Sequence, residues 1–200
     1  RGFEMASNAV VGFNSRMEQA SIAFKTMLGS GEKARAFLGE LERFASETPF
    51  EFPDLVKASQ RMLAFGFSSQ QVVPLLTSIG DAVAALGGGS VEIDRVTLAI
   101  GQMQTRTKVS AEEMNQLVEV GIPGWQLLAD AIGKTVPEVQ KLAEQGRISS
   151  AVFIQAFQDF SKAKFGGQMA EQAKTFQGAM STIKDNLTSA VATGFKPFFE

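Results

Sequence analysis

The sequence predicts an all-α protein, in which a multi-helix domain of short capped helices lies between two longer heptad-patterned helices. Three observations support this fold class. Small and apolar residues recur at spacings of three and four near both ends of the chain. Helix start and stop signals follow one another through the middle region. No segment has the sustained alternation of a convincing strand. We therefore expect a heptad helix at 1–29, a compact helical domain at 30–167, and a heptad helix at 168–200 that leads into a longer parent chain.

The two terminal patterns each run for about three heptads, which is short for a coiled coil that is stable alone. They are therefore expected to pack on each other, on the middle region or on another chain, although ordinary amphipathic helices explain the spacing equally well. The first pattern comprises Phe3, Ala6, Val10, Phe13, Met17, Ala20, Phe24 and Met27. The second follows Gly166-Gly167 and comprises Met169, Ala173, Phe176, Met180, Ile183, Leu187 and Ala190. A homo-oligomer would use an assembly seam made of Phe13, Met17, Phe24, Phe176, Met180, Ile183 and Leu187.

The middle region is divided by helix caps, in which a side-chain oxygen satisfies free amides and a glycine accepts left-handed backbone geometry. Three capping-box pairs occur, namely Ser68 with Gln71, Ser110 with Glu113, and Thr135 with Glu138. Stop signals are Gly66, Gly121, Gly133 and Gly146. These signals predict helices near 31–46, 54–65, 69–86, 91–104, 111–120, 124–132, 136–145 and 151–163. Pro74 is expected to kink the third of these helices or to split off its first turn.

The segment from Glu47 to Asp54 is predicted to be a rigid elbow. Pro49 and Pro53 fix an extended backbone around Phe50 and Phe52, and Pro53 suits a helix start. The acidic residues of the segment, including Glu51, raise the alternative of acid/base catalysis on a glycan, which requires two carboxyl groups that face each other. Sequence neighbours rarely do so, and a structural connection anchored by the two phenylalanines is the better interpretation.

The run Gly87-Gly88-Gly89 is predicted to be a hinge rather than a nucleotide site. It lacks the Gly-Lys-Ser/Thr continuation of a phosphate-binding loop and does not follow a predicted strand. Ser90 is expected to cap the helix that follows. Nothing in this stretch demands a ligand.

A helix-turn-helix pattern offers the sharpest alternative function, DNA binding. Ala129, Gly133 and Val139 have the spacing of many DNA-binding units. The second helix of the pair, however, carries two acidic residues, one basic residue and a proline where groove-reading side chains should lie. Trp125, after Ile122-Pro123-Gly124, is either a partner-binding anchor or, as we prefer, part of the core.

The composition limits the chemistry of the chain. Its 200 residues suffice for one or two domains, and the hydrophobic and charged fractions of 44% and 20% are those of folded protein. The net charge of -2 gives no general attraction to nucleic acid or to anionic membranes. Cys and His are both absent, which excludes Ser-His-Asp triads, thiol nucleophiles and Cys/His zinc sites. We predict no catalytic residues, no metal, no cofactor and no membrane span. The start at Arg1 and the apolar end lead us to expect an excerpt of a longer chain.

Residues 44–187 resemble the tape measure domain of phage and prophage tail tape measure proteins. The similar blocks are FASETPFEFPDLVKASQRMLAFG (44–66), IGDAVAALGGG (79–89), IDRVTLAIGQM (93–103), KVSAEEMNQLVEVGIPGWQLLADAIGKTVPEVQKLAEQGRIS (108–149) and KTFQGAMSTIKDNL (174–187). The motif residues within them are Pro49, Phe50, Glu51, Phe52, Pro53, Gly87, Gly88, Gly89, Ser110, Glu113, Pro123, Trp125, Gly133, Thr135 and Glu138.

The resemblance implies a structural protein that sets tail length, supports assembly of the tail tube and takes part in genome ejection. Its implied partners are tail-tube subunits, the tail-tip or baseplate hub, and tail assembly chaperones. Its implied location is the lumen of the virion tail, after assembly in the host cytoplasm. Some tape measure proteins carry peptidoglycan-cleaving domains, so such an enzyme is a further alternative.

Overall fold

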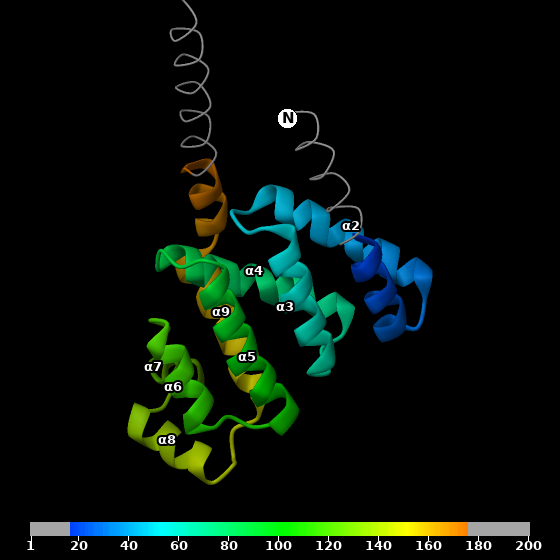
Figure 1. Ribbon diagram of the computed structural model, residues 1–200. Helices are drawn as coiled ribbons and strands as arrows, with labels where there is room; N and C mark the ends of the chain where they lie inside the picture. Colours follow the sequence, from blue (N-terminus) through cyan, green and yellow to red (C-terminus); the bar gives the residue numbers. More distant parts are fainter. Residues whose placement is uncertain (1–16, 176–200) are drawn as a thin grey trace, which may run out of the picture.

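The computed structural model describes residues 17–175, which fold as a series of α-helices (Figure 1). A helix at 17–28 is followed by α2 (Gly31–Glu47), α3 (Phe52–Ala64), α4 (Ser69–Ala85) and α5 (Ser90–Arg106). The chain continues with α6 (Ala111–Glu119), α7 (Gly124–Ile132), α8 (Val136–Glu144), α9 (Ser150–Phe165) and a helix that begins at 168. No β-strand occurs within 17–175, where an isolated bridge joins Lys108 and Ser149. The predicted all-α class is confirmed.

The helix boundaries agree with the local start and stop signals. None of the eight helices predicted in the middle region differs by more than two residues at either end. The Gln71 side chain accepts a hydrogen bond from the Ser68 amide at 2.9 Å, and Glu138 accepts one from the Thr135 amide at 2.8 Å. These bonds satisfy amides that the first helical turn leaves without a partner, which explains why both helices begin where they do.

The Ser90 prediction was wrong, and the Pro74 prediction was tested only in part. Pro74 does not split off the first turn of α4, which runs unbroken from Ser69 to Ala85, and a kink there stays a prediction. Proline removes the amide that would donate to the Gln70 carbonyl, but Gln70 is exposed, so water can replace that one bond. Ser90 is not a cap but the first residue of α5, and Gly89 is the N-cap. The Glu92 carboxylate accepts a hydrogen bond from the Gly89 amide at 2.8 Å, so the capping interaction comes from inside the helix.

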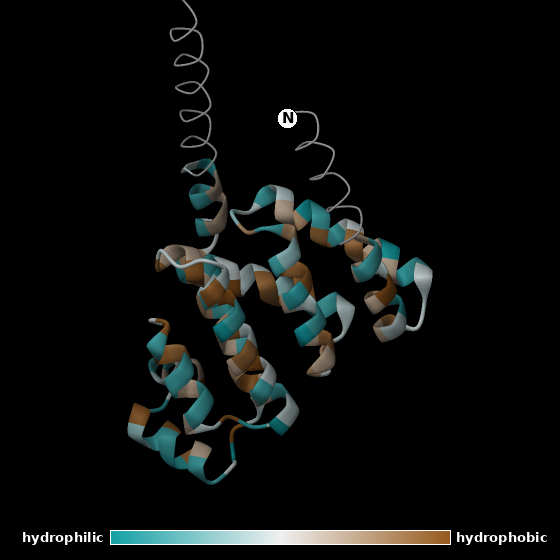
Figure 2. Cartoon of the chain, in the orientation of Figure 1, coloured by the Kyte–Doolittle hydropathy of each residue, from teal (hydrophilic) through white to brown (hydrophobic). Residues whose placement is uncertain are grey.

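The core is built around α4, α5 and α9. Helix α4 packs against α9, α5, α3 and α2, and α5 packs against α6, α3, α4 and α9. Most helices carry both hydrophobic and hydrophilic residues (Figure 2), as expected for elements with one buried face. The large side chains that are less than 2% exposed are Phe24, Phe153, Phe157, Leu41, Leu55, Met62, Leu75, Leu76, Ile79, Ile100, Met103 and Met114.

Helices α6, α7 and α8 form a lobe at one end of the molecule (Figure 1). They follow α5 and precede α9 in the chain. Two backbone hydrogen bonds close its base, from the Val109 amide to the Ile148 carbonyl at 3.0 Å and from the Ser150 amide to the Thr107 carbonyl at 3.2 Å. Thr107 ends α5 with a left-handed backbone, φ 58°. This geometry is unusual for a residue other than glycine, and no turn glycine in the sequence marks it.

Candidate functional site

Two motifs that lie far apart in the sequence meet at the point where the compact domain joins the helix at 168–175. The elbow and the glycine run line the same cavity, of about 660 Å³, and the C-terminal helix forms a further wall. We call this region the junction. The cavity is lined by Ala45, Ser46, Thr48, Pro49, Phe50, Glu51, Asp54, Gly88, Gly89, Ser90, Gln172 and Ala173.

The elbow supplies the apolar part of the junction. Phe50 is 5% exposed and packs over Gly80 of α4, where an added Cβ would lie 3.1 Å from its ring. The same Cβ would overlap the sulfur of Met169, so Gly80 allows the C-terminal helix to rest directly on the α4 backbone. Phe52 is half-buried against the core, and Pro53 lies in the first turn of α3 as predicted. The structure thus gives the elbow a packing role.

Asp81 fixes the start of the C-terminal helix. Its carboxylate is 7% exposed and accepts hydrogen bonds from the Gly167 amide at 3.2 Å and the Met169 amide at 3.0 Å. Amides of a first helical turn have no partner within their own helix, and a negative charge there is favoured by the helix dipole. Asp81 therefore caps a helix more than 80 residues away in sequence, as the 86-residue and 88-residue separations of the two bonds show.

The glycine run forms a tight connection between α4 and α5. Gly87 adopts φ 73°, and the Gly88 amide donates to the Val83 carbonyl at 2.9 Å, which closes the end of α4. A Cβ on Gly88 would lie 2.9 Å from Val83 Cγ1, so the turn has no room for a side chain. The Gly89 amide donates a hydrogen bond to the Glu92 carboxylate, and this bond lowers the pKa of the Glu92 carboxyl below its ordinary value of 4.5. Hinge motion at this turn stays a prediction.

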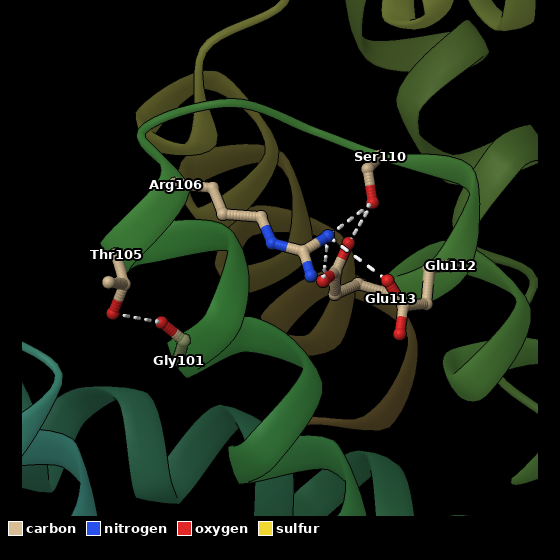
Figure 3. Close-up of polar contacts among 6 residues, drawn as sticks. All are labelled: Gly101, Thr105, Arg106, Ser110, Glu112 and Glu113. Atoms are coloured by element: carbon tan, nitrogen blue, oxygen red, sulfur yellow. Dashed lines mark hydrogen bonds and ion pairs between the residues drawn. The ribbon is translucent and has the colours of Figure 1, made fainter.

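A polar cluster joins the end of α5 to the start of α6 (Figure 3). Glu113 is completely buried, its Oε1 lies 2.9 Å from the Arg106 guanidinium, and its Oε2 accepts a hydrogen bond from the Ser110 hydroxyl. Glu112, which is exposed, also contacts Arg106, at 3.1 Å. A buried carboxylate is tolerated only when it is paired. The capping box predicted for Ser110 and Glu113 was wrong: Ser110 is the N-cap of α6, but its side chain accepts no hydrogen bond from a backbone amide there. Glu113 instead pairs with the Ser110 hydroxyl and with Arg106.

The helix-turn-helix segment has the predicted local geometry. Gly133 ends α7 in the left-handed region, φ 65°, and α7 packs against α8. Thr135 donates hydrogen bonds to Glu138 from its hydroxyl at 2.7 Å and from its amide, and these bonds lower the pKa of the Glu138 carboxyl. Pro123 occupies the N-cap of α7, and Trp125 is half-buried against the core. Trp125 also lines a second cavity, of about 460 Å³, beside α6 and α8.

The predicted seam residues fall into two groups. Phe24 is completely buried within its own chain, where its ring meets that of Phe37 edge to face with centroids 5.0 Å apart. Met17 is half-buried. The helix at 17–28 thus shares the core of the domain across the predicted boundary at residue 29. Phe13, Phe176, Met180, Ile183 and Leu187 lie outside the described residues.

The chemistry of these groups is that of caps, ion pairs and close packing. Within 17–175, no group of three or more His, Cys, Asp or Glu residues is arranged to hold a metal ion. The same part of the chain contains no helix with the length and apolar character needed to cross a membrane. Sequence reasoning missed Asp81, because the amides that it accepts hydrogen bonds from lie more than 80 residues away in sequence. It also missed Arg106, whose partners are close in sequence at the start of α6, and Thr107, whose left-handed backbone no glycine marks.

Comparison with known proteins identifies the family. The tape measure protein family model matches residues 8–194. The chain is 28% identical to the Mu-like prophage FluMu protein gp42 of Haemophilus influenzae over 96% of its own length, and 24% identical to the probable tape measure protein of Escherichia phage Mu over 91%. It is 27% identical to the tape measure protein of Lactococcus phage F4-1 over 84%.

The chain spans only part of these relatives, namely 30% of the first, 26% of the second and 45% of the third. No solved structure matches it significantly. The family match nevertheless covers nearly the whole chain and coincides with the helices, the elbow and the glycine turn described above. The chain therefore belongs to the tape measure protein family.

Proposed function

We propose that this chain is a structural part of a phage tail tape measure protein, and that the whole protein sets tail length while the tail tube assembles around it. The observation that carries the proposal is the family match over residues 8–194. The polar groups described above support it, because their geometry is explained by helix capping and packing.

The proposed mechanism uses the rise of an α-helix, about 1.5 Å per residue, so that the length of a chain held extended in a tube limits the length of the tube. In this scheme the heptad segment that begins at 168 belongs to the rod. The helix at 17–28 shares the domain core, so it and the compact region at 30–167 do not act as a ruler while they remain folded. The proposed partners are tail-tube subunits, the tail-tip or baseplate hub and assembly chaperones. The proposed site of action is the tube lumen, after assembly in the host cytoplasm.

Changing the length of the parent gene product tests the proposal. An insertion of about four heptads into the helical rod of the parent protein should lengthen the tail by roughly 42 Å, at 1.5 Å per residue. The measurement is tail length in electron micrographs of particles from the mutant. A matched insertion into the exposed turn at Gly146, within the lobe, is the control and should leave tail length unchanged. Tails of unaltered length after the rod insertion would contradict the ruler function.

The proposal includes no catalytic step. Incubating the purified chain with peptidoglycan should release no soluble fragments. Peptidoglycan cleavage that disappears in Glu51→Gln, a variant of an exposed elbow carboxylate, would replace the structural function with an enzymatic one. Binding of duplex DNA at low salt that weakens as salt rises would similarly favour the helix-turn-helix alternative.

A further inference from the structure

The contact between Asp81 and the C-terminal helix joins two parts of the chain that the proposed function treats differently. Asp81 belongs to α4 of the compact domain, and the amides that it binds belong to the start of the helix that follows α9. The Asp81 carboxylate accepts hydrogen bonds from the amides of Gly167 and Met169, and we call these three groups together the catch. We propose that the catch sets the direction in which the C-terminal helix leaves the domain, and that it opens before the rest of the domain unfolds.

The direction of the helix is set by several contacts at once. Gly166 ends α9, and an added Cβ there would lie 2.6 Å from the Lys162 carbonyl oxygen. Gly167 has φ 87°, a left-handed geometry that favours glycine. The two glycines therefore break the helix between α9 and 168. The catch then restarts it with a negative charge at its N-terminus, in the orientation that Asp81 allows.

The helix approaches α4 closely at Gly80. Gly80 has no side chain, and Met169, which is 5% exposed, occupies that space beside Phe50. About one helical turn before Asp81 in α4, the Ser78 carbonyl accepts a hydrogen bond from the Ser161 hydroxyl of α9 at 2.7 Å. The catch therefore lies next to a fixed contact with α9 on one side and a close helix crossing on the other.

The proposed order of opening follows from how little of segment 168–175, the described part of the C-terminal helix, is buried. Within 168–175, Met169 and Ala173 are the buried residues. In α9, by contrast, Phe153 and Phe157 are completely buried in the domain core. Segments with few buried apolar contacts open locally at a lower free energy than core helices do. Tension applied from the C-terminal side also reaches the catch before it reaches α9.

Asp81 couples this opening to the domain. A carboxylate that is buried without a partner is strongly unfavourable. While Asp81 remains buried, its two hydrogen bonds to the C-terminal helix therefore stabilise the docked position of that helix. When the helix leaves, the carboxylate becomes accessible to water, and the core around α9 stays intact. In a tape measure protein, opening of the catch would let the rod change direction while the domain stays folded. This role in the rod rests on the proposed function, whereas the catch itself does not.

A distance measurement on the 200-residue chain tests the direction. The chain contains no cysteine, so Ala36→Cys in α2 and Ala170→Cys in the C-terminal helix, both exposed, provide the only two sites for spin labels. The doubly labelled chain with Asp81 intact should give one narrow distribution of distances between the labels by pulsed electron paramagnetic resonance. Asp81→Ala should broaden it, and Asp81→Asn, which keeps one oxygen acceptor, should broaden it less. The control is Asp159→Asn, an exposed acid beside the same cavity as Asp81, which should leave the distribution unchanged.

Hydrogen exchange tests the order of opening. In the unsubstituted chain, amides of 167–175 should exchange faster than those around Phe157. Asp81→Ala should accelerate exchange at Gly167 and Met169 about tenfold or more, the effect of losing a charge-assisted hydrogen bond, and leave α9 unchanged. Unchanged exchange and distances in Asp81→Ala would overturn the proposal, as would equal acceleration throughout α9.

If Asp81→Ala fails to fold, the Asp81→Asn distribution decides the outcome. A broadened distribution supports the catch, and an unchanged one rejects it. These measurements use purified protein alone, so failure of the catch is distinguishable from failure of the tail-length function.

Discussion

Gly101 provides a quantitative test of how closely α3 and α5 pack. It is buried in α5, and an added Cβ would fall well inside the van der Waals radius of the Phe65 ring, which ends α3. Gly101→Ala therefore combines two opposing effects. Alanine improves helix propensity by about 1 kcal/mol, whereas forcing an extra methyl group into a packed site costs about 1 to 3 kcal/mol. We expect a net loss of about 1 kcal/mol in the free energy of unfolding.

Gly39 is a matched control. It lies within α2, is exposed, and has no atom within 4 Å of an added Cβ. Gly39→Ala should therefore gain about 1 kcal/mol from propensity alone. Because both variants share the propensity gain, the difference between them isolates the steric cost at Gly101. At about 2 to 4 °C per kcal/mol for a chain of this size, the melting temperatures should move in opposite directions.

The assay is urea denaturation followed by circular dichroism, with thermal melting as a second measure. Repeating Gly101→Ala in a Phe65→Ala background should remove the steric cost, since the ring that causes it is gone. If Gly101→Ala is as stable as Gly39→Ala, or if Phe65→Ala does not relieve the loss, the close packing of α3 on α5 is refuted.

Three further predictions concern the core and the caps. Phe24→Ala should lower the free energy of unfolding by about 3 to 5 kcal/mol in urea denaturation and leave the solution mass unchanged. A dissociating oligomer would instead show that Phe24 acts between chains. Glu113→Ala should cost about 2 kcal/mol, because it removes the buried partner of a charged hydrogen-bonded cluster; the exposed control Glu112→Ala should cost less than about 1 kcal/mol, and equal losses would contradict this assignment. The Gly89 amide lowers the pKa of Glu92 from 4.5, so the stability that the carboxylate contributes is present above pH 4.5 and is lost as the pH falls through the folded-state pKa. The stability difference between the unsubstituted chain and Glu92→Gln should therefore shrink below about pH 4.5, and a constant difference across a pH series would count against the cap.

Local signals predicted the helices well because capping is a local interaction. Ser68 and Thr135 each find their partner three residues later, within the same helical turn. The prediction for Ser90 was wrong because glycine also serves as an N-cap when a following glutamate supplies the acceptor, as Glu92 does. Helix α4 stays unbroken at Pro74 although proline removes one backbone hydrogen bond, that to the carbonyl of the exposed residue Gln70.

The junction could be predicted only in part. The elbow and the glycine run were both recognised as motifs, but nothing in their spacing indicates that they line one cavity. Spacing likewise cannot tell whether a heptad residue such as Phe24 packs within its own chain or on a second one, because the apolar pattern is the same in both cases.

The sequence by itself determined the all-α class, the positions of the middle helices, the lack of Cys and His chemistry, and the resemblance that pointed to the family. These depend on residue type and on neighbours within one or two helical turns. Only the tertiary structure decided that Asp81 caps a helix 86 residues further along, that Arg106 covers the buried Glu113, and that Gly80 makes room for Met169. Each of these contacts depends on how one helix crosses another, and that crossing is set by the packing of the whole core rather than by any local pattern.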